Sequence, residues 1–149
     1  IGTNGGVNGV TSGTGRTYIM YAFTSIEGYS AFGSFTGNGS ADGPMIVTGF
    51  KPALVICKTY NYATTTNTSW AMFDNARDPH NVMNKVLYAN QSASEGYRGD
   101  GSTAATDIYI DFLSNGFKIR ANYHEHNSDQ DGVLYAAWAE MPQKYAVAR

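Results

Sequence analysis

The stretch Leu113–Ile119 reads "LSNGFKI" and contains the strongest β-hairpin signal in the chain. An Asn-Gly pair is favoured in the tight turn that joins two antiparallel strands. After the turn, the apolar residues Phe117, Ile119 and Ala121 alternate with basic residues. Because side chains along a strand point to opposite faces in turn, this pattern predicts a strand with one buried and one exposed face.

Similar short runs occur along the whole chain, separated by turn signals such as "GNGS", "DGP", "SEGYRGDGS" and "DQDG". No window keeps a helical period, and the best helical candidate is a single short turn that begins at Asp78 and Pro79. The spacing predicts an all-β fold, an antiparallel β-sandwich or jelly roll. The expected strands are Tyr18–Ile26, Ala31–Phe35, Met45–Phe50, Ala53–Lys58, Ser69–Phe73, Lys85–Tyr88, Ile108–Leu113, Phe117–Ala121 and Val133–Met141.

Composition limits the classes of partner. A length of 149 residues is typical of one domain, and 17 Gly with 13% aromatic residues fit strands joined by many turns. Charged residues make up 15% and the net charge is -2, so the basic excess that nucleic acid requires is missing. No apolar run is long enough to span a bilayer, and we expect a soluble protein without membrane insertion. Cys57, the single cysteine, lies in the apolar run "ALVICK" and is expected to be a buried core residue.

Two similar segments lie near the ends of the chain: "YIMYAFTSIEGY" at Tyr18–Tyr29 and "VLYAAWAEMPQKY" at Val133–Tyr145. One explanation is a tandem architecture in which each copy closes one unit, and the other is chance similarity between two β-strands. In the tandem case, the first segment pairs with the domain's own sheet or buries its apolar face against a neighbouring chain by β-strand addition. The candidate assembly residues are Tyr18, Met20, Tyr21 and Phe23.

These segments suggest a division of the chain. We expect a Gly-rich linker or loop over residues 1–15, and over residues 16–30 a strand shared with, or inherited from, a preceding unit. Residues 31–142 are expected to form the β-sandwich domain, and residues 143–149 a C-terminal extension. The chain begins at Ile1 rather than Met, which suggests a processed product, a trimmed fragment or the ordered part of a longer polypeptide, and we favour the last.

A family resemblance covers nearly everything from Arg16 to Pro142. It is carried by "EGYSAFGSFTGNGSADGPMIVTGFKPALVICK", "WAMFDNARDP", "DFLSNGFKIR" and "LYAAWAEMP". The sequence resembles an uncharacterised, lectin-like β-sandwich domain, often in tandem, of marine bacteriophage virion and tail-fibre structural proteins. The resemblance implies a place on the surface of a virion and partners that are copies of the same chain or other virion proteins. Its motifs define a fold rather than a catalytic site.

Four residues are candidate ligand contacts. Arg77 stands between two carboxylates in "DNARDP", where it either grips an anionic ligand or belongs to an internal Asp–Arg network. Tyr60, Tyr62 and Tyr97 lie in polar loops, where aromatic rings contact either glycan or the next subunit.

Metal and catalytic sites are not expected. His124 and His126 are weak candidates for a metal pair, with Asp129, Asp131 or His80 as a third ligand, but their spacing is not diagnostic. We therefore expect no metal and no cofactor. A hydrolase would need two suitably placed carboxylates, and the possible ones are Asp74, Asp78, Glu95, Asp107 and Asp111.

The leading hypothesis is thus a non-enzymatic virion structural protein, a fibre, spike or outer-shell unit that acts through subunit assembly. The alternative is a lectin-like receptor-binding module that contacts host surface glycan.

Overall fold

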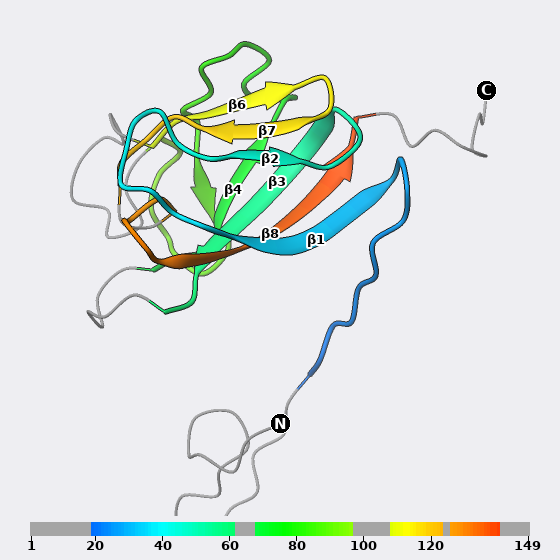
Figure 1. The fold of residues 1–149 in the computed structure, drawn as a ribbon, viewed down its shortest axis with the longest axis horizontal. Helices are drawn as coiled ribbons and strands as arrows, with labels where there is room; N and C mark the ends of the chain where they lie inside the picture. Colours follow the sequence, from blue (N-terminus) through cyan, green and yellow to red (C-terminus); the bar gives the residue numbers. More distant parts are fainter. Residues whose placement is uncertain (1–18, 62–67, 97–107, 124–125, 141–149) are drawn as a thin grey trace, which may run out of the picture.

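The chain forms two antiparallel β-sheets in the computed structural model, which describes residues 19–61, 68–96, 108–123 and 126–140 (Figure 1). The larger sheet has five strands in the order β1-β8-β3-β4-β5, and the smaller has three in the order β2-β7-β6. The strands are β1 (Ser30–Thr36), β2 (Met45–Val47), β3 (Pro52–Thr59), β4 (Ala71–Asp74), β5 (Leu87–Tyr88), β6 (Ile110–Leu113), β7 (Gly116–Ile119) and β8 (Gly132–Ala139).

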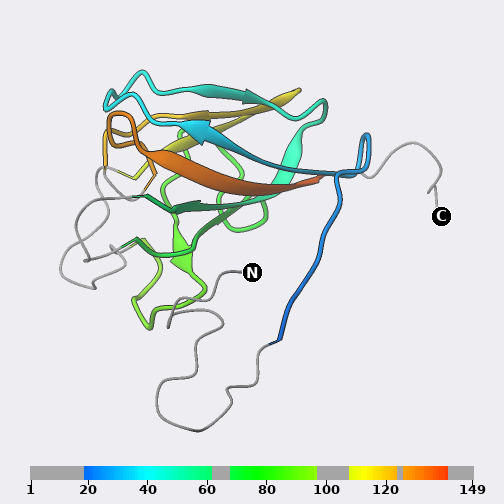
Figure 2. The same cartoon turned by 60° about the horizontal axis from the view of Figure 1, so that its bottom comes forward.

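The two sheets lie in two layers with the apolar core between them (Figure 2). Phe117 of β7 joins the layers: its ring centroid lies 5.5 Å from that of Tyr135 on β8 and 6.3 Å from that of Phe35 on β1. Cys57 is fully buried in this core, as predicted. Burial raises the pKa of its thiol to about 12, because the thiolate would lose its hydration.

The all-β prediction is confirmed: every expected strand except Tyr18–Ile26 overlaps an observed one. The hairpin at "LSNGFKI" is present, with Leu113 of β6 paired to Gly116 of β7. Phe117, Ile119 and Ala121 are all buried, as their alternation indicated. Among the described residues there is no helix, and so none long and apolar enough to cross a membrane.

The prediction of a helical turn at Asp78 is wrong. The backbone N–H groups of this segment bond elsewhere: those of Asn84 (2.7 Å) and Lys85 (3.2 Å) donate to the Asp78 carboxylate. Met83 forms two backbone hydrogen bonds with Ile110 on β6. The segment therefore lies against the edge of the smaller sheet, because its hydrogen bonds are made to β6 rather than along its own backbone.

Residues 19–25, which we call the arm, form no strand with the sheets of this chain. The first bridge is between Ile26 and Ser30, where the chain turns into β1. Pairing of the arm with another chain or with a preceding unit stays a prediction. Tyr18, the linker over residues 1–15 and the extension over 143–149 lie outside the described residues.

Candidate functional site

The arm exposes several large apolar side chains. Its exposed fractions are 80% for Ile19, 79% for Met20, 77% for Tyr21 and 65% for Phe23. Figures 1 and 2 both show the arm extending away from the two sheets. Three of the four sequence-predicted assembly residues are therefore among the most exposed apolar side chains of the described chain.

Phe23 is the point at which the arm touches the larger sheet. Its ring stacks on Phe32 of β1 with centroids 5.3 Å apart and planes inclined by 21°. It also meets Trp138 of β8 edge-on at 6.1 Å. Phe32 and Trp138 lie 5.4 Å apart, so the three rings form one cluster at a corner of the sheet.

Hydrogen bonds fix the base of the arm along the free edge of β1. The Ser25 hydroxyl accepts a hydrogen bond from the Phe32 backbone N–H (3.0 Å), and the Ser30 hydroxyl donates to the Thr24 carbonyl (3.2 Å). The backbones of Ile26 and Ser30 exchange two further bonds of 2.9 Å. The N-terminal half of this edge is thus occupied by the chain's own residues.

The larger sheet carries a second apolar face, on the side opposite the core. The strand registers place five apolar side chains in one line across all five strands. Each is partly exposed, while neighbours such as Val55, Phe73 and Ala137 point into the core. We call this line the outer row: Phe32 (β1), Ala136 (β8), Ile56 (β3), Met72 (β4) and Leu87 (β5).

The outer row was not predicted from the sequence as a surface. A signal was present, because the run "ALVICK" in β3 is apolar at consecutive positions and does not alternate. Strands of that type belong to sheets covered on both faces. In this chain the three-stranded sheet covers only the inner face. Among the described residues, no second sheet covers the outer row, and its side chains stay partly exposed.

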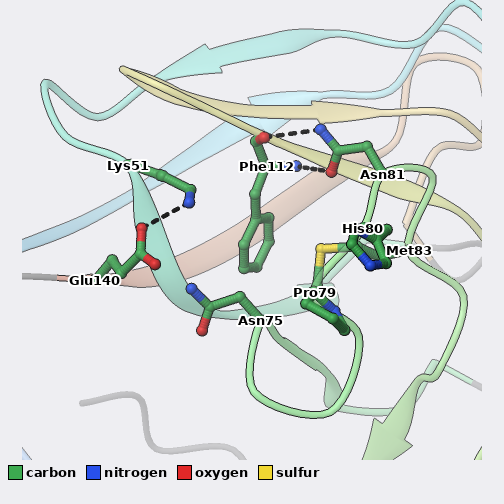
Figure 3. A pocket seen from close by; sticks show the side chains of 8 residues that line it. All are labelled: Lys51, Asn75, Pro79, His80, Asn81, Met83, Phe112 and Glu140. Carbon is green, nitrogen blue, oxygen red and sulfur yellow. Dashed lines mark hydrogen bonds and ion pairs between the residues drawn. The ribbon is translucent and has the colours of Figure 1, made fainter.

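A hollow of about 340 Å³ lies beside the start of β3 and the end of β8 (Figure 3). The buried side chains of Met83 and Phe112 form its apolar base. Lys51 and Glu140 form a 2.7 Å ion pair on one side, and Asn75 and His80 line the rim. This volume is near the lower limit for small-molecule sites. The hollow could not be predicted from the sequence, because its lining residues come from separate segments.

Arg77 is held in an internal network. Its Nε lies 2.5 Å from Asp74 Oδ2, and its Nη1 donates to Glu95 Oε1 at 2.7 Å and to the Lys85 carbonyl at 2.8 Å. Partial burial by itself would raise the pKa of Asp74, but hydrogen bonds from the Arg77 backbone and guanidinium lower it below its usual 3.8. The Asp–Arg network is present. Contact with an external anion stays a prediction.

The remaining sequence candidates that the structure describes do not form a common site. Tyr60 is 58% exposed, and its ring lies against Gly132. His126 is fully buried, with its ring 5.9 Å from that of Phe73. Tyr62, Tyr97 and His124 lie outside the described residues. Within the described part of the chain, no group of three or more His, Cys, Asp or Glu residues is placed to hold a metal ion.

The candidate carboxylates are each engaged by groups of their own chain where the structure describes them. Asp74 and Glu95 bind Arg77, and Asp78 accepts two backbone hydrogen bonds. Asp111 lies 2.8 Å from Arg120 Nε, and Asp107 lies outside the described residues. In the hollow, Glu140 is the one carboxylate among the lining residues that the structure describes.

These features define an all-β domain of two antiparallel sheets with an exposed apolar arm and an apolar outer sheet face. Residues 2–142 match the family described as "Domain of unknown function (DUF7483)". This match spans most of the chain, so the chain belongs to that family. No curated protein and no solved structure matches the chain.

Proposed function

We propose that this chain is a non-enzymatic structural unit that acts by assembling with copies of itself or with other proteins of a virion. The observation that carries the proposal is the arm, which presents Ile19, Met20 and Tyr21 to solvent at 77–80% exposure. Burying one such side chain contributes about 1.5–3 kcal/mol. Monomeric proteins rarely expose contiguous apolar patches of this kind, and where they occur they mark interaction sites.

The setting we propose is the surface of a bacteriophage particle, in a fibre, spike or outer shell. It is supported by the resemblance of the strand and turn motifs to marine phage structural proteins. The two-layer arrangement of the sheets supports the finer assignment of a β-sandwich or jelly roll with lectin-like character. Such a protein acts by assembly: its apolar surfaces contact neighbouring subunits, and its polar loops face outward.

The proposal is tested by the mass of the purified 149-residue chain in solution. Sedimentation velocity should show an oligomer whose mass rises with concentration. Replacing Ile19, Met20 and Tyr21 together by Ser should shift it towards the monomer. The matched control is Val47→Ser with Val82→Ser, because these side chains are also exposed (64% and 48%) but lie far from the arm in sequence. A wild-type chain that stays monomeric at high concentration and binds no virion protein contradicts the proposal.

A second function, recognition of host surface glycan, is supported by the hollow of Figure 3. Its base of Met83 and Phe112 suits the C–H face of a sugar ring, and the side chains of Asn75 and His80 suit its hydroxyls. Neither of these two side chains makes a hydrogen bond to another described residue. The test is binding of the chain to a glycan array.

Under this second function, Asn75→Ala and His80→Ala should each weaken the binding of any glycan that the wild-type chain captures. Tyr60→Ala is the matched comparison, because Tyr60 belongs to the loop set predicted from the sequence. Loss of binding only in Tyr60→Ala would assign recognition to the loops instead of the hollow. No binding across a broad array would argue against this function altogether.

A further inference from the structure

We propose that the outer row of one copy is the docking surface for the arm of a second copy of this chain. The inference rests on the proposed assembly function and names its contact. In a dimer with a twofold axis, the arm of each copy would pack on the outer row of the other. Ile19, Met20 and Tyr21 would then contact the far part of the row, which is formed by Ile56, Met72 and Leu87.

Continuity with an existing contact supports this choice. Phe23 already packs against Phe32, which is one end of the outer row, and against the neighbouring Trp138. The rest of the row remains partly exposed. In the described part of the chain, an exposed apolar arm and a partly exposed apolar row therefore meet at one corner of the sheet. In a single chain the arm runs outward instead of folding back onto this face, which leaves it available to a second copy (Figure 2).

Both surfaces are also uncharged. Residues 19–23 read "IMYAF" and carry no charge, and neither do the five residues of the outer row. The charged side chains that border the row are held by their own chain: Lys58 Nζ donates to the Thr68 carbonyl at 2.5 Å, and Asp74 is paired with Arg77. Docking therefore requires no unpaired charge to leave water.

Pairing of the arm with the free edge of β1 is the alternative contact, and the structure disfavours it. The N–H group of Phe32 is already bound by the Ser25 hydroxyl, and Ser30 is bound by Ile26. An added strand would have to displace these bonds or be confined to Ser34–Thr36. The outer row needs no such displacement.

Cross-linking distinguishes the two contacts. One protein carries Tyr21→Cys and another carries Met72→Cys, so a disulfide can form only between copies; the native Cys57 is fully buried and does not compete. Met72 lies on β4, three strands from β1. An arm paired to the free edge of β1 would therefore lie four strand spacings, about 19 Å, from Met72. Ser34→Cys reports on pairing at that edge, and Val47→Cys, on the smaller sheet, is the control for random collision.

We expect the Tyr21→Cys protein to link to Met72→Cys on a non-reducing gel and not to Val47→Cys. We also expect Ile56→Thr with Met72→Thr to raise the dissociation constant of the oligomer about tenfold or more, with Val47→Thr unchanged. An oligomer whose arm links to Ser34→Cys and not to Met72→Cys overturns the outer-row contact but leaves the assembly function standing. A chain that is monomeric at all concentrations overturns both.

Discussion

The Asn81 carboxamide forms two hydrogen bonds with the backbone of Phe112: Nδ2 donates to the carbonyl at 2.9 Å, and Oδ1 accepts from the N–H at 2.9 Å. Phe112 lies on β6, an edge strand of the smaller sheet. The side-chain amide thus takes the position of a neighbouring strand at this residue. It covers backbone groups that would otherwise be open to pairing with another chain.

Replacing Asn81 by Ala should destabilise the fold, because it removes both partners of the Phe112 backbone. We expect the free energy of unfolding, measured by urea denaturation, to fall by about 1–3 kcal/mol. Asn122→Ala is the control, since Asn122 is exposed and makes no side-chain hydrogen bond to another described residue. Equal stability of the two variants would show that the amide does not support the edge.

The Asp74–Arg77 pair should make stability depend on pH. The folded-state pKa of Asp74 lies below its usual 3.8, so the unfolded chain binds a proton more readily. The stabilisation is therefore present above pH 3.8 and is lost as the pH falls through the folded-state pKa. Arg77→Gln should be less stable at neutral pH, and its urea midpoint should fall less between neutral pH and about pH 3. Parallel midpoint curves for the two proteins would contradict this role of Arg77.

The strands could be predicted from the sequence because their signals are local. At "LSNGFKI" the turn residues and the alternation lie within a few positions, and the observed hairpin follows both. The segment at Asp78 misled because a good helix start does not indicate where later backbone groups bond. The Asn81 side chain and the Met83 backbone bond to Phe112 and Ile110 of β6, about thirty residues further along the chain. No local pattern encodes this contact.

The candidate site was only partly predictable for a related reason. The apolar arm was visible in the run "YIMYAF", because five large apolar or aromatic side chains so close together need a partner. The outer row was not, because Phe32, Ile56 and Leu87 fall into one line only through the registers of five strands. These strands are far apart in the chain, and a local reading of the sequence does not show which residues of two distant strands are paired.

Gly116 should tolerate no side chain. A Cβ at this position would collide with the backbone carbonyl oxygen of Ile46 on β2, which cannot move without breaking the pairing of β2 with β7. We expect Gly116→Ala to lower the free energy of unfolding by about 1–3 kcal/mol. Gly33→Ala should cost less, because its Cβ would meet the Tyr135 side chain at 3.0 Å, and a side chain can shift. If Gly33→Ala were the less stable of the two variants, the collision at Gly116 would not be the larger source of strain.

Phe23 should shield Trp138 from solvent even in the isolated chain. Trp70 is the second tryptophan, so a Trp70→Phe background makes the fluorescence report on Trp138 alone. In this background, Phe23→Ala should shift the emission to longer wavelength and increase quenching by acrylamide. The free energy of unfolding should fall by about 0.5–1.5 kcal/mol, the contribution of an aromatic contact of this geometry.

Tyr21→Ala is the matched control for Phe23→Ala, because it removes another exposed arm ring that has no aromatic contact among the described residues. At low protein concentration, where copies are apart, it should leave the Trp138 emission unchanged. If the arm docks on a second copy, the Tyr21 control should change oligomer mass at high concentration, whereas Phe23→Ala should change both mass and Trp138 exposure. Identical emission from the two variants at low concentration would mean that Phe23 does not hold the arm to its own sheet.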